Sequence, residues 1–133
     1  MRFLTVDDDQ AILTLVENLI YNLGHETVGC LTEEEAKQVE GEIHGVIVDW
    51  HLGDTTCEPL TRELKNRYPG VPIMMITGDS DLDLIQSALA LGVQDWWFKP
   101  TGLENLKAQI KSMIADAARA RSRQRRPEDR QAA

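Results

Sequence analysis

Two apolar runs of this chain end in aspartates. Residues 3–6 lead into Asp7 and Asp8, and residues 46–48 lead into Asp49. Carboxylates that lie a few Å apart repel, and each raises the pKa of the other unless a cation neutralises them. A small site rich in carboxylate oxygens suits Mg²⁺, which keeps several waters and uses one or two carboxylates. Asp7, Asp8 and Asp49 are therefore candidate Mg²⁺ ligands if the fold brings the two runs together.

Two further apolar runs end in side chains that could bind a phosphoryl group. Thr77 closes the run 71–77, and Lys99 follows the run 96–98. The Lys99 ammonium could pair with an acidic oxygen or a phosphoryl group, and the Thr77 hydroxyl could hydrogen-bond a phosphoryl oxygen. Together with the acidic residues, they predict a phosphoryl-accepting carboxylate, Asp49, beside a charge-neutralising metal.

The elements that would position these residues alternate along the chain. Apolar runs typical of strands are followed by stretches whose apolar residues recur three and four positions apart, as in amphipathic helices. The expected strands are 3–6, 26–30, 46–48, 71–77 and 96–98. Five repeats of strand and helix predict an α/β fold, a five-stranded parallel sheet with helices on both faces. In such folds chemistry gathers at the carboxyl ends of the strands, where the polar residues stand.

Local signals predict where helices begin and end. Gly24 follows the apolar stripe 11–23 and should end that helix. Thr32 and Glu35 have the spacing of a capping box, which predicts a helix from there to about Gly41. Residues 101–104 repeat this spacing before the last helix.

Charge is distributed unevenly along the chain. The net charge is −8, yet residues 119–133 hold six Arg against two acidic residues, a net +4, which leaves −12 for residues 1–118. An acidic body is a poor nucleic-acid binder, so only the basic segment is a candidate for that role. We expect one domain over residues 1–118 and a flexible tail over 119–133.

The remaining composition favours a cytoplasmic protein. No run approaches the roughly 18 apolar residues that a membrane-spanning helix needs, and the acidic N-terminus does not resemble a secretory signal. Cys30 and Cys57 are far apart in the sequence and are expected to be free thiols.

Four motifs in order resemble the receiver domain of two-component response regulators. They read VDDD, VIVDW, MMITGD and WWFKP. Each alone is weak, but all four in this order, over about 115 residues of the chain, are specific. The resemblance implies the flavodoxin-like (βα)₅ receiver fold and a single-domain regulator of the chemotaxis type.

The resemblance also implies roles for the acidic site. Asp49 matches the aspartate that accepts the phosphoryl group. Asp7 and Asp8 match the acidic pair, with Asp8 a direct Mg²⁺ ligand and Asp7 acting mainly through water. The backbone carbonyl of His51 matches the third protein ligand of the metal.

Further residues match the positions that respond to phosphorylation. Thr77 corresponds to the switch hydroxyl, Lys99 to the phosphate-binding lysine and Trp96 to the switch aromatic. The family also implies a cis peptide bond between Lys99 and Pro100.

The function that the resemblance implies is signalling. Such a domain catalyses only its own phosphotransfer and autodephosphorylation, and takes its phosphoryl group from a histidine kinase or a histidine phosphotransfer protein. It would then bind a downstream protein through the face made by the helix around 84–91, strand 96–98 and the helix from 103.

Other interpretations stay open at this point. The chain could be the receiver part of a longer DNA-binding regulator, with the basic segment as the start of a linker. An aspartate-nucleophile phosphatase also forms an acyl phosphate, but it needs a second Asp where His51 stands. A flavodoxin-like carrier of FMN needs a Ser/Thr-rich loop after the first strand, where aspartates would repel the phosphate.

Overall fold

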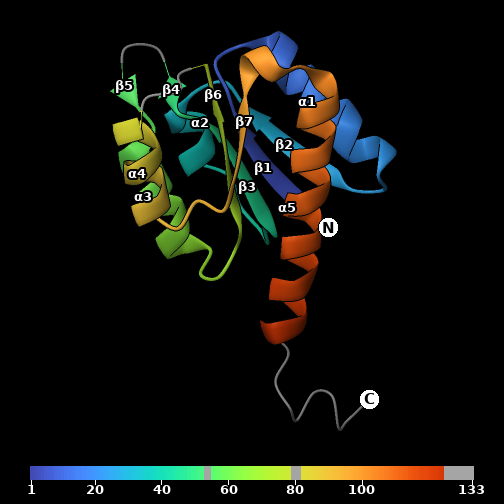
Figure 1. Ribbon diagram of the computed structural model, residues 1–133. Helices are drawn as coiled ribbons and strands as arrows, with labels where there is room; N and C mark the ends of the chain where they lie inside the picture. Colours follow the sequence, from blue (N-terminus) through green and yellow to red (C-terminus); the bar gives the residue numbers. More distant parts are fainter. Residues whose placement is uncertain (53–54, 79–81, 125–133) are drawn as a thin grey trace, which may run out of the picture.

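Five parallel strands form the central sheet of the computed structural model, which describes residues 1–52, 55–78 and 82–124 (Figure 1). The sheet order is β2-β1-β3-β6-β7. Its strands are β1 (Arg2–Val6), β2 (Glu26–Cys30), β3 (Gly45–Asp49), β6 (Ile73–Thr77) and β7 (Asp95–Phe98). The helices are α1 (Gln10–Asn22), α2 (Glu33–Lys37), α3 (Glu58–Arg67), α4 (Leu82–Ala90) and α5 (Leu103–Gln124). The predicted α/β fold with a five-stranded parallel sheet is therefore confirmed.

Alternate side chains of each strand enter two separate hydrophobic layers. Val46 and Val48 of β3 lie in the layer under α2, α3 and α4, with Leu60 and Leu64 of α3. Ile47 lies in the opposite layer, which α1 and α5 cover. Because successive strand residues point to opposite faces, an uninterrupted apolar run is what a strand buried on both faces requires. Figure 1 shows the two helical layers on either side of the sheet.

The helix boundaries predicted from the sequence were partly confirmed. Asp9 caps α1 by accepting the Ala11 N–H, and Thr32 caps α2 by accepting the Glu35 N–H at 3.1 Å. The Glu35 carboxylate in turn accepts the Leu31 N–H at 3.0 Å. However, α2 ends at Lys37, earlier than predicted.

The segment after β3 forms a small hairpin that the sequence did not predict. β4 (His51–Leu52) pairs in antiparallel fashion with β5 (Thr55–Thr56). The hairpin begins two residues after Asp49 and fixes the direction of the backbone beside that carboxylate.

The segment that joins β7 to α5 also differs from the prediction. Residues Lys99–Thr101 form the 3-10 turn η1, and the Thr101 hydroxyl donates to the Phe98 carbonyl at 2.7 Å instead of capping the helix. Gly102, with φ +90°, leads into α5. No cis peptide bond occurs in the described residues, so the expectation for Lys99–Pro100 is wrong.

The last helix continues beyond the predicted end of the domain. α5 reaches Gln124, so the first part of the Arg-rich segment is helical, while the rest of the predicted tail lies outside the described residues. Across the described chain, no helix combines the length and the apolar character that crossing a bilayer would need.

Candidate functional site

The order of the strands brings the acidic residues together. β1 pairs with β3 in a register that sets Val6 beside Val48, so Asp7 and Asp49 leave the sheet at the same edge. One carboxylate oxygen from each of Asp7, Asp8 and Asp49 lies within 4.8 Å of the others. The three aspartates singled out in the sequence therefore form one cluster at the carboxyl ends of the central strands.

Asp7 is the most deeply buried member of the cluster, with no exposed surface. Its Oδ1 accepts the Asp9 N–H at 2.9 Å, while its Oδ2 is buried and has no hydrogen-bond partner among the described residues. Burial is the main cause that raises the pKa of Asp7 from 3.8 to about 7, and the negative charge of Asp49 adds to it. The hydrogen bond from Asp9 and the positive charge of Lys99 oppose this rise.

Asp49 is held by a backbone donor and a cation. Its Oδ1 accepts the His51 N–H at 3.2 Å, and its Oδ2 lies 3.3 Å from Lys99 Nζ. The Asp49 side chain is 5% exposed and the Lys99 side chain 34%. The carboxylate is thus oriented by its neighbours, while the ammonium that faces it keeps contact with solvent.

Sheet pairing also sets Thr77 next to this cluster. β6 pairs with β3 so that Ile76 lies beside Asp49, and β7 pairs with β6 so that Phe98 lies beside Thr77. Thr77 is buried, and its backbone leaves the sheet at the same edge as Asp49 and Lys99. The four strand ends singled out in the sequence therefore meet at one place.

The other two predicted residues lie at the margin of the site. The backbone of His51 starts β4 and its side chain is exposed, which leaves the role of its carbonyl a prediction. Trp96 lies on β7 and is 36% exposed, whereas the neighbouring Trp97 is 5% exposed and donates from Nε1 to the Gly102 carbonyl at 3.1 Å. Trp96 therefore points outward and Trp97 belongs to the core.

The arrangement of the carboxylates fits a small hard cation. Three acidic groups share one space, and the buried Oδ2 of Asp7 lacks a donor within the described part of the chain. A divalent cation with its waters would satisfy that oxygen and offset the repulsion between Asp7 and Asp49.

Sequence reasoning predicted the free thiol of Cys57 but did not place Cys57 or Trp50 near the acceptor. Trp50 directly follows Asp49, is 1% exposed and accepts the Cys57 N–H at its carbonyl oxygen at 2.7 Å. Cys57 is fully buried and a free thiol, and burial raises its pKa well above the usual range. Both side chains belong to the hydrophobic layer under α2, α3 and α4, and the Trp that ends the VIVDW motif was the available signal.

Comparisons with known proteins agree with this geometry. The model of the response regulator receiver domain family matches residues 3–111. The transcriptional regulatory protein PmrA of Pectobacterium parmentieri is 32% identical over 120 residues, which cover 86% of this chain and 52% of PmrA. The chemotaxis protein CheY1 of Helicobacter pylori is 26% identical over 122 residues, which cover 86% of this chain and 97% of CheY1. The chain thus spans about half the length of PmrA and nearly all of CheY1.

A solved structure shares the same architecture. The CheY-like response regulator receiver domain protein from Methanospirillum hungatei JF-1 superposes with a TM-score of 0.77 at 27% identity. The similarity covers 89% of this chain and 96% of that protein.

Proposed function

Because this chain belongs to the response regulator receiver domain family, we propose that it is a signalling switch in which Asp49 accepts a phosphoryl group. One observation carries the proposal. Asp49 shares an oxygen-rich space with Asp7 and Asp8, and its Oδ2 lies 3.3 Å from the ammonium of Lys99. A carboxylate nucleophile, a set of metal ligands and a cation for the transferred group are the components that phosphoryl transfer to an aspartate needs.

The proposed reaction is a displacement at phosphorus. A carboxylate oxygen of Asp49 forms a bond to the phosphorus of a phosphohistidine, and the phosphorus–nitrogen bond of the donor breaks. The electron pair leaves with the imidazole nitrogen, which takes up a proton. Lys99 would pair with the phosphoryl oxygens after transfer, and the hydrogen bond from the His51 N–H would hold the carboxylate in its orientation.

We propose that Asp7, Asp8, Asp49 and the His51 carbonyl hold Mg²⁺. When bound, the ion would neutralise charge that develops on the phosphoryl oxygens. In its absence burial raises the pKa of Asp7, and the negative charge of Asp49 adds to this rise. The protein contributes ligands that are positioned by two adjacent strands before any phosphodonor arrives.

Thr77 and Trp96 are the proposed switch residues. A phosphoryl group on Asp49 adds negative charge and acceptor oxygens beside the end of β6, where the Thr77 hydroxyl is buried. A shift of Thr77 would change the packing between β6 and β7, and Trp96 on β7 is 36% exposed. The face made by α4, β7 and α5 would then bind a downstream protein.

The proposed phosphodonor is a histidine kinase or a histidine phosphotransfer protein, and the proposed location is the cytoplasm. We propose no turnover of other substrates, only phosphotransfer to Asp49 and hydrolysis of the resulting aspartyl phosphate to inorganic phosphate. A phosphatase of the aspartate-nucleophile class is disfavoured because His51 replaces the second Asp and its side chain is exposed.

A second candidate is the receiver part of a longer transcriptional regulator. The observation that favours it is the match to PmrA, a transcriptional regulatory protein of which this chain spans about half. Reading the coding sequence downstream of Ala133 for a DNA-binding domain distinguishes this candidate from a single-domain regulator.

The experiment that tests the proposed function uses acetyl phosphate as the donor. Intact-mass spectrometry should detect the addition of one phosphoryl group in the presence of Mg²⁺ and none with EDTA. Thr77→Val should be phosphorylated, yet the change in Trp fluorescence that accompanies phosphorylation of the wild type should be lost. Addition of no phosphoryl group to the wild type would contradict the proposal, and an unchanged fluorescence response in Thr77→Val would exclude Thr77 as the switch.

A further inference from the structure

The helix α4 is held to the domain mainly at its carboxyl end. Ala88 is buried there, and so are Leu91 and Val93, which follow the helix. In the amino half, Leu84 and Ile85 are only half-buried. An element with few buried apolar contacts is displaced at a low cost in free energy. The amino end of α4, which follows β6 along the chain, is therefore the end that moves more easily.

Lys65 of α3 adds a polar contact at the carboxyl end of α4. Its Nζ donates to the Leu91 carbonyl at 2.8 Å, and we call this hydrogen bond the α4 anchor. Carbonyls at the end of a helix lack partners within it and carry the negative end of the helix dipole, so an ammonium is favourable there. Gly92 leaves room for this ammonium, because an added Cβ would lie 3.0 Å from Nζ.

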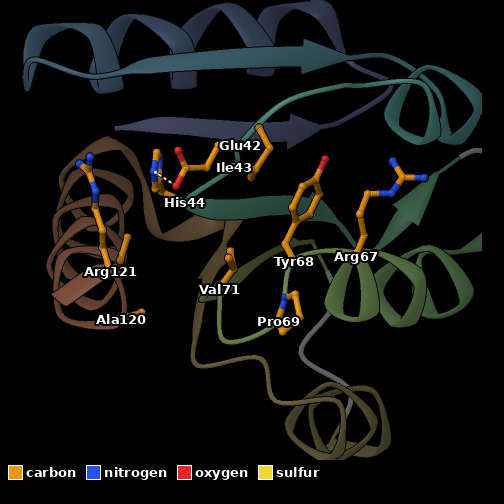
Figure 2. Close-up of a pocket in the computed structure, with 10 residues that line it drawn as sticks. Glu42, Ile43, His44, Arg67, Tyr68, Pro69, Val71, Ala120 and Arg121 are labelled. Atoms are coloured by element: carbon orange, nitrogen blue, oxygen red, sulfur yellow. Dashed lines mark ion pairs between the residues drawn. The ribbon is translucent and has the colours of Figure 1, made fainter. Parts of the chain in front are cut away.

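Arg67 makes the corresponding contact with the helix on the other side of α3. Since α3 joins β3 to β6, it lies between α2 and α4. The Arg67 Nη1 donates to the carbonyl of Lys37, the last residue of α2, at 2.8 Å. Figure 2 shows the Arg67 side chain extending away from the end of α3. Residues two positions apart in a helix point about 200° apart, so Lys65 and Arg67 reach opposite neighbours.

We propose that the α4 anchor fixes the carboxyl end of α4, so that α4 responds to a change at the acidic site by tilting about Leu91. A shift of Thr77 reaches α4 first at its amino end, because the chain runs from β6 into that end. Since the other end is held, the helix tilts instead of sliding along the sheet. A partner that distinguishes the two states must therefore contact the amino half of α4. The role of Thr77 rests on the proposed function, whereas the α4 anchor itself does not.

The first test measures amide hydrogen exchange by NMR in the full chain, without a phosphodonor. The amides of Gly92 and Val93, the two reporter amides, donate to carbonyls of α4, so their exchange reports opening of this helix end. Lys65→Met should accelerate their exchange about three- to tenfold, because a charge-assisted hydrogen bond is lost. Unchanged exchange at both reporter amides would overturn the α4 anchor.

Two matched variants show whether this effect is local. Arg67→Met should accelerate exchange of Gln38 and Val39, whose amides donate to carbonyls of α2, and should leave the reporter amides as in the wild type. Arg62→Met removes a cation that pairs with a carboxylate of its own helix, and should accelerate neither set. Equal acceleration of the reporter amides in Lys65→Met and Arg62→Met would overturn the proposal.

The second test adds beryllofluoride and Mg²⁺, which together mimic an aspartyl phosphate. In the wild type, amide chemical shifts should change strongly over residues 83–86 and little at the reporter amides. In Lys65→Met the changes should extend to the reporter amides. Equally large changes in both regions of the wild type would overturn the tilt. No change anywhere would overturn the proposed function and with it the tilt, while the exchange data still decide the α4 anchor.

Discussion

Replacing Asp7 with Asn removes the buried carboxylate of the acidic site whose pKa is raised mainly by burial. The ordinary pKa of an aspartate is 3.8, and the pKa of Asp7 in the folded protein is about 7. Between these two pH values the folded state therefore holds a proton on Asp7 that the unfolded state has lost. The resulting stabilisation is fully present below about pH 4 and is lost as the pH rises through about 7. The difference in pKa corresponds to about 4 kcal/mol of unfolding free energy.

We therefore expect the stability of Asp7→Asn relative to the wild type to depend on pH. At about pH 4 the two proteins should differ by less than about 1 kcal/mol. At about pH 8 without Mg²⁺ the variant should be more stable by about 2–4 kcal/mol, because Asn keeps the acceptor for the Asp9 N–H and carries no charge. Adding about 10 mM Mg²⁺ should narrow this gap, since the ion stabilises the folded wild type by about 1 kcal/mol or more if it binds in the millimolar range.

The assay is urea denaturation followed by Trp fluorescence at several pH values, in EDTA and in Mg²⁺. Glu104→Gln is the matched control, because it removes one exposed carboxylate and should change stability by no more than about 0.5 kcal/mol at any pH. A difference between Asp7→Asn and the wild type that does not vary with pH would refute the reasoning. A variant that is less stable than the wild type at pH 8 would refute it as well.

Two further predictions concern Lys99 and the close packing of Phe3 in β1 against Gly45 in the adjacent strand β3. Lys99→Gln should slow phosphorylation by acetyl phosphate about ten- to hundredfold, because a charge-assisted contact is lost. The control Lys107→Gln, on the exposed face of α5, should be phosphorylated at the wild-type rate. Equal rates for the two variants in a time course by intact mass would contradict the role of Lys99. Gly45→Ala should destabilise the fold by about 1–3 kcal/mol, because an added Cβ would lie 2.6 Å from the Phe3 ring. Gly29→Ala, where the nearest atom is 3.6 Å away, should change the urea midpoint much less, and similar losses in both would show that ring crowding is not the cause.

The sheet and the acidic cluster could be predicted because both follow from patterns along the chain. Apolar runs such as 46–48 require burial on both faces, and parallel strands bring their carboxyl ends to one edge. Asp49 and Lys99 are fifty positions apart in the sequence, yet each directly follows such a run. Their contact therefore needed only the strand order, which the family resemblance supplied.

Which helix residues are buried depends on how each helix packs against the sheet, and the spacing of apolar residues along the sequence does not specify this. The stripe on α1 predicted Ala11 and Leu23 as inward residues, but both are exposed, and Leu13 is buried instead, against Gly29 of β2. An absent side chain at Gly29 lets the helix approach the strand there. Leu103, the first residue of α5, is 47% exposed although it is apolar.

The burial of His44 and the full length of α5 could not have been predicted from the sequence either. His44 stands just before the run 46–48 with no pattern that predicts burial, yet its side chain is only 12% exposed and accepts a backbone N–H from β1. The helix α5 continues to Gln124, within a segment whose composition suggested a flexible tail. Long-range packing of this kind leaves no local pattern to detect.

The most direct test of the central claim is to locate the phosphoryl group. After treatment with acetyl phosphate and Mg²⁺, borohydride reduction converts an aspartyl phosphate to homoserine, which peptide mass spectrometry assigns to one position. We predict homoserine at position 49 in the wild type and no labelling in Asp49→Asn. Homoserine at another aspartate in the wild type, or undiminished labelling of Asp49→Asn, would contradict the assignment of Asp49 as the acceptor.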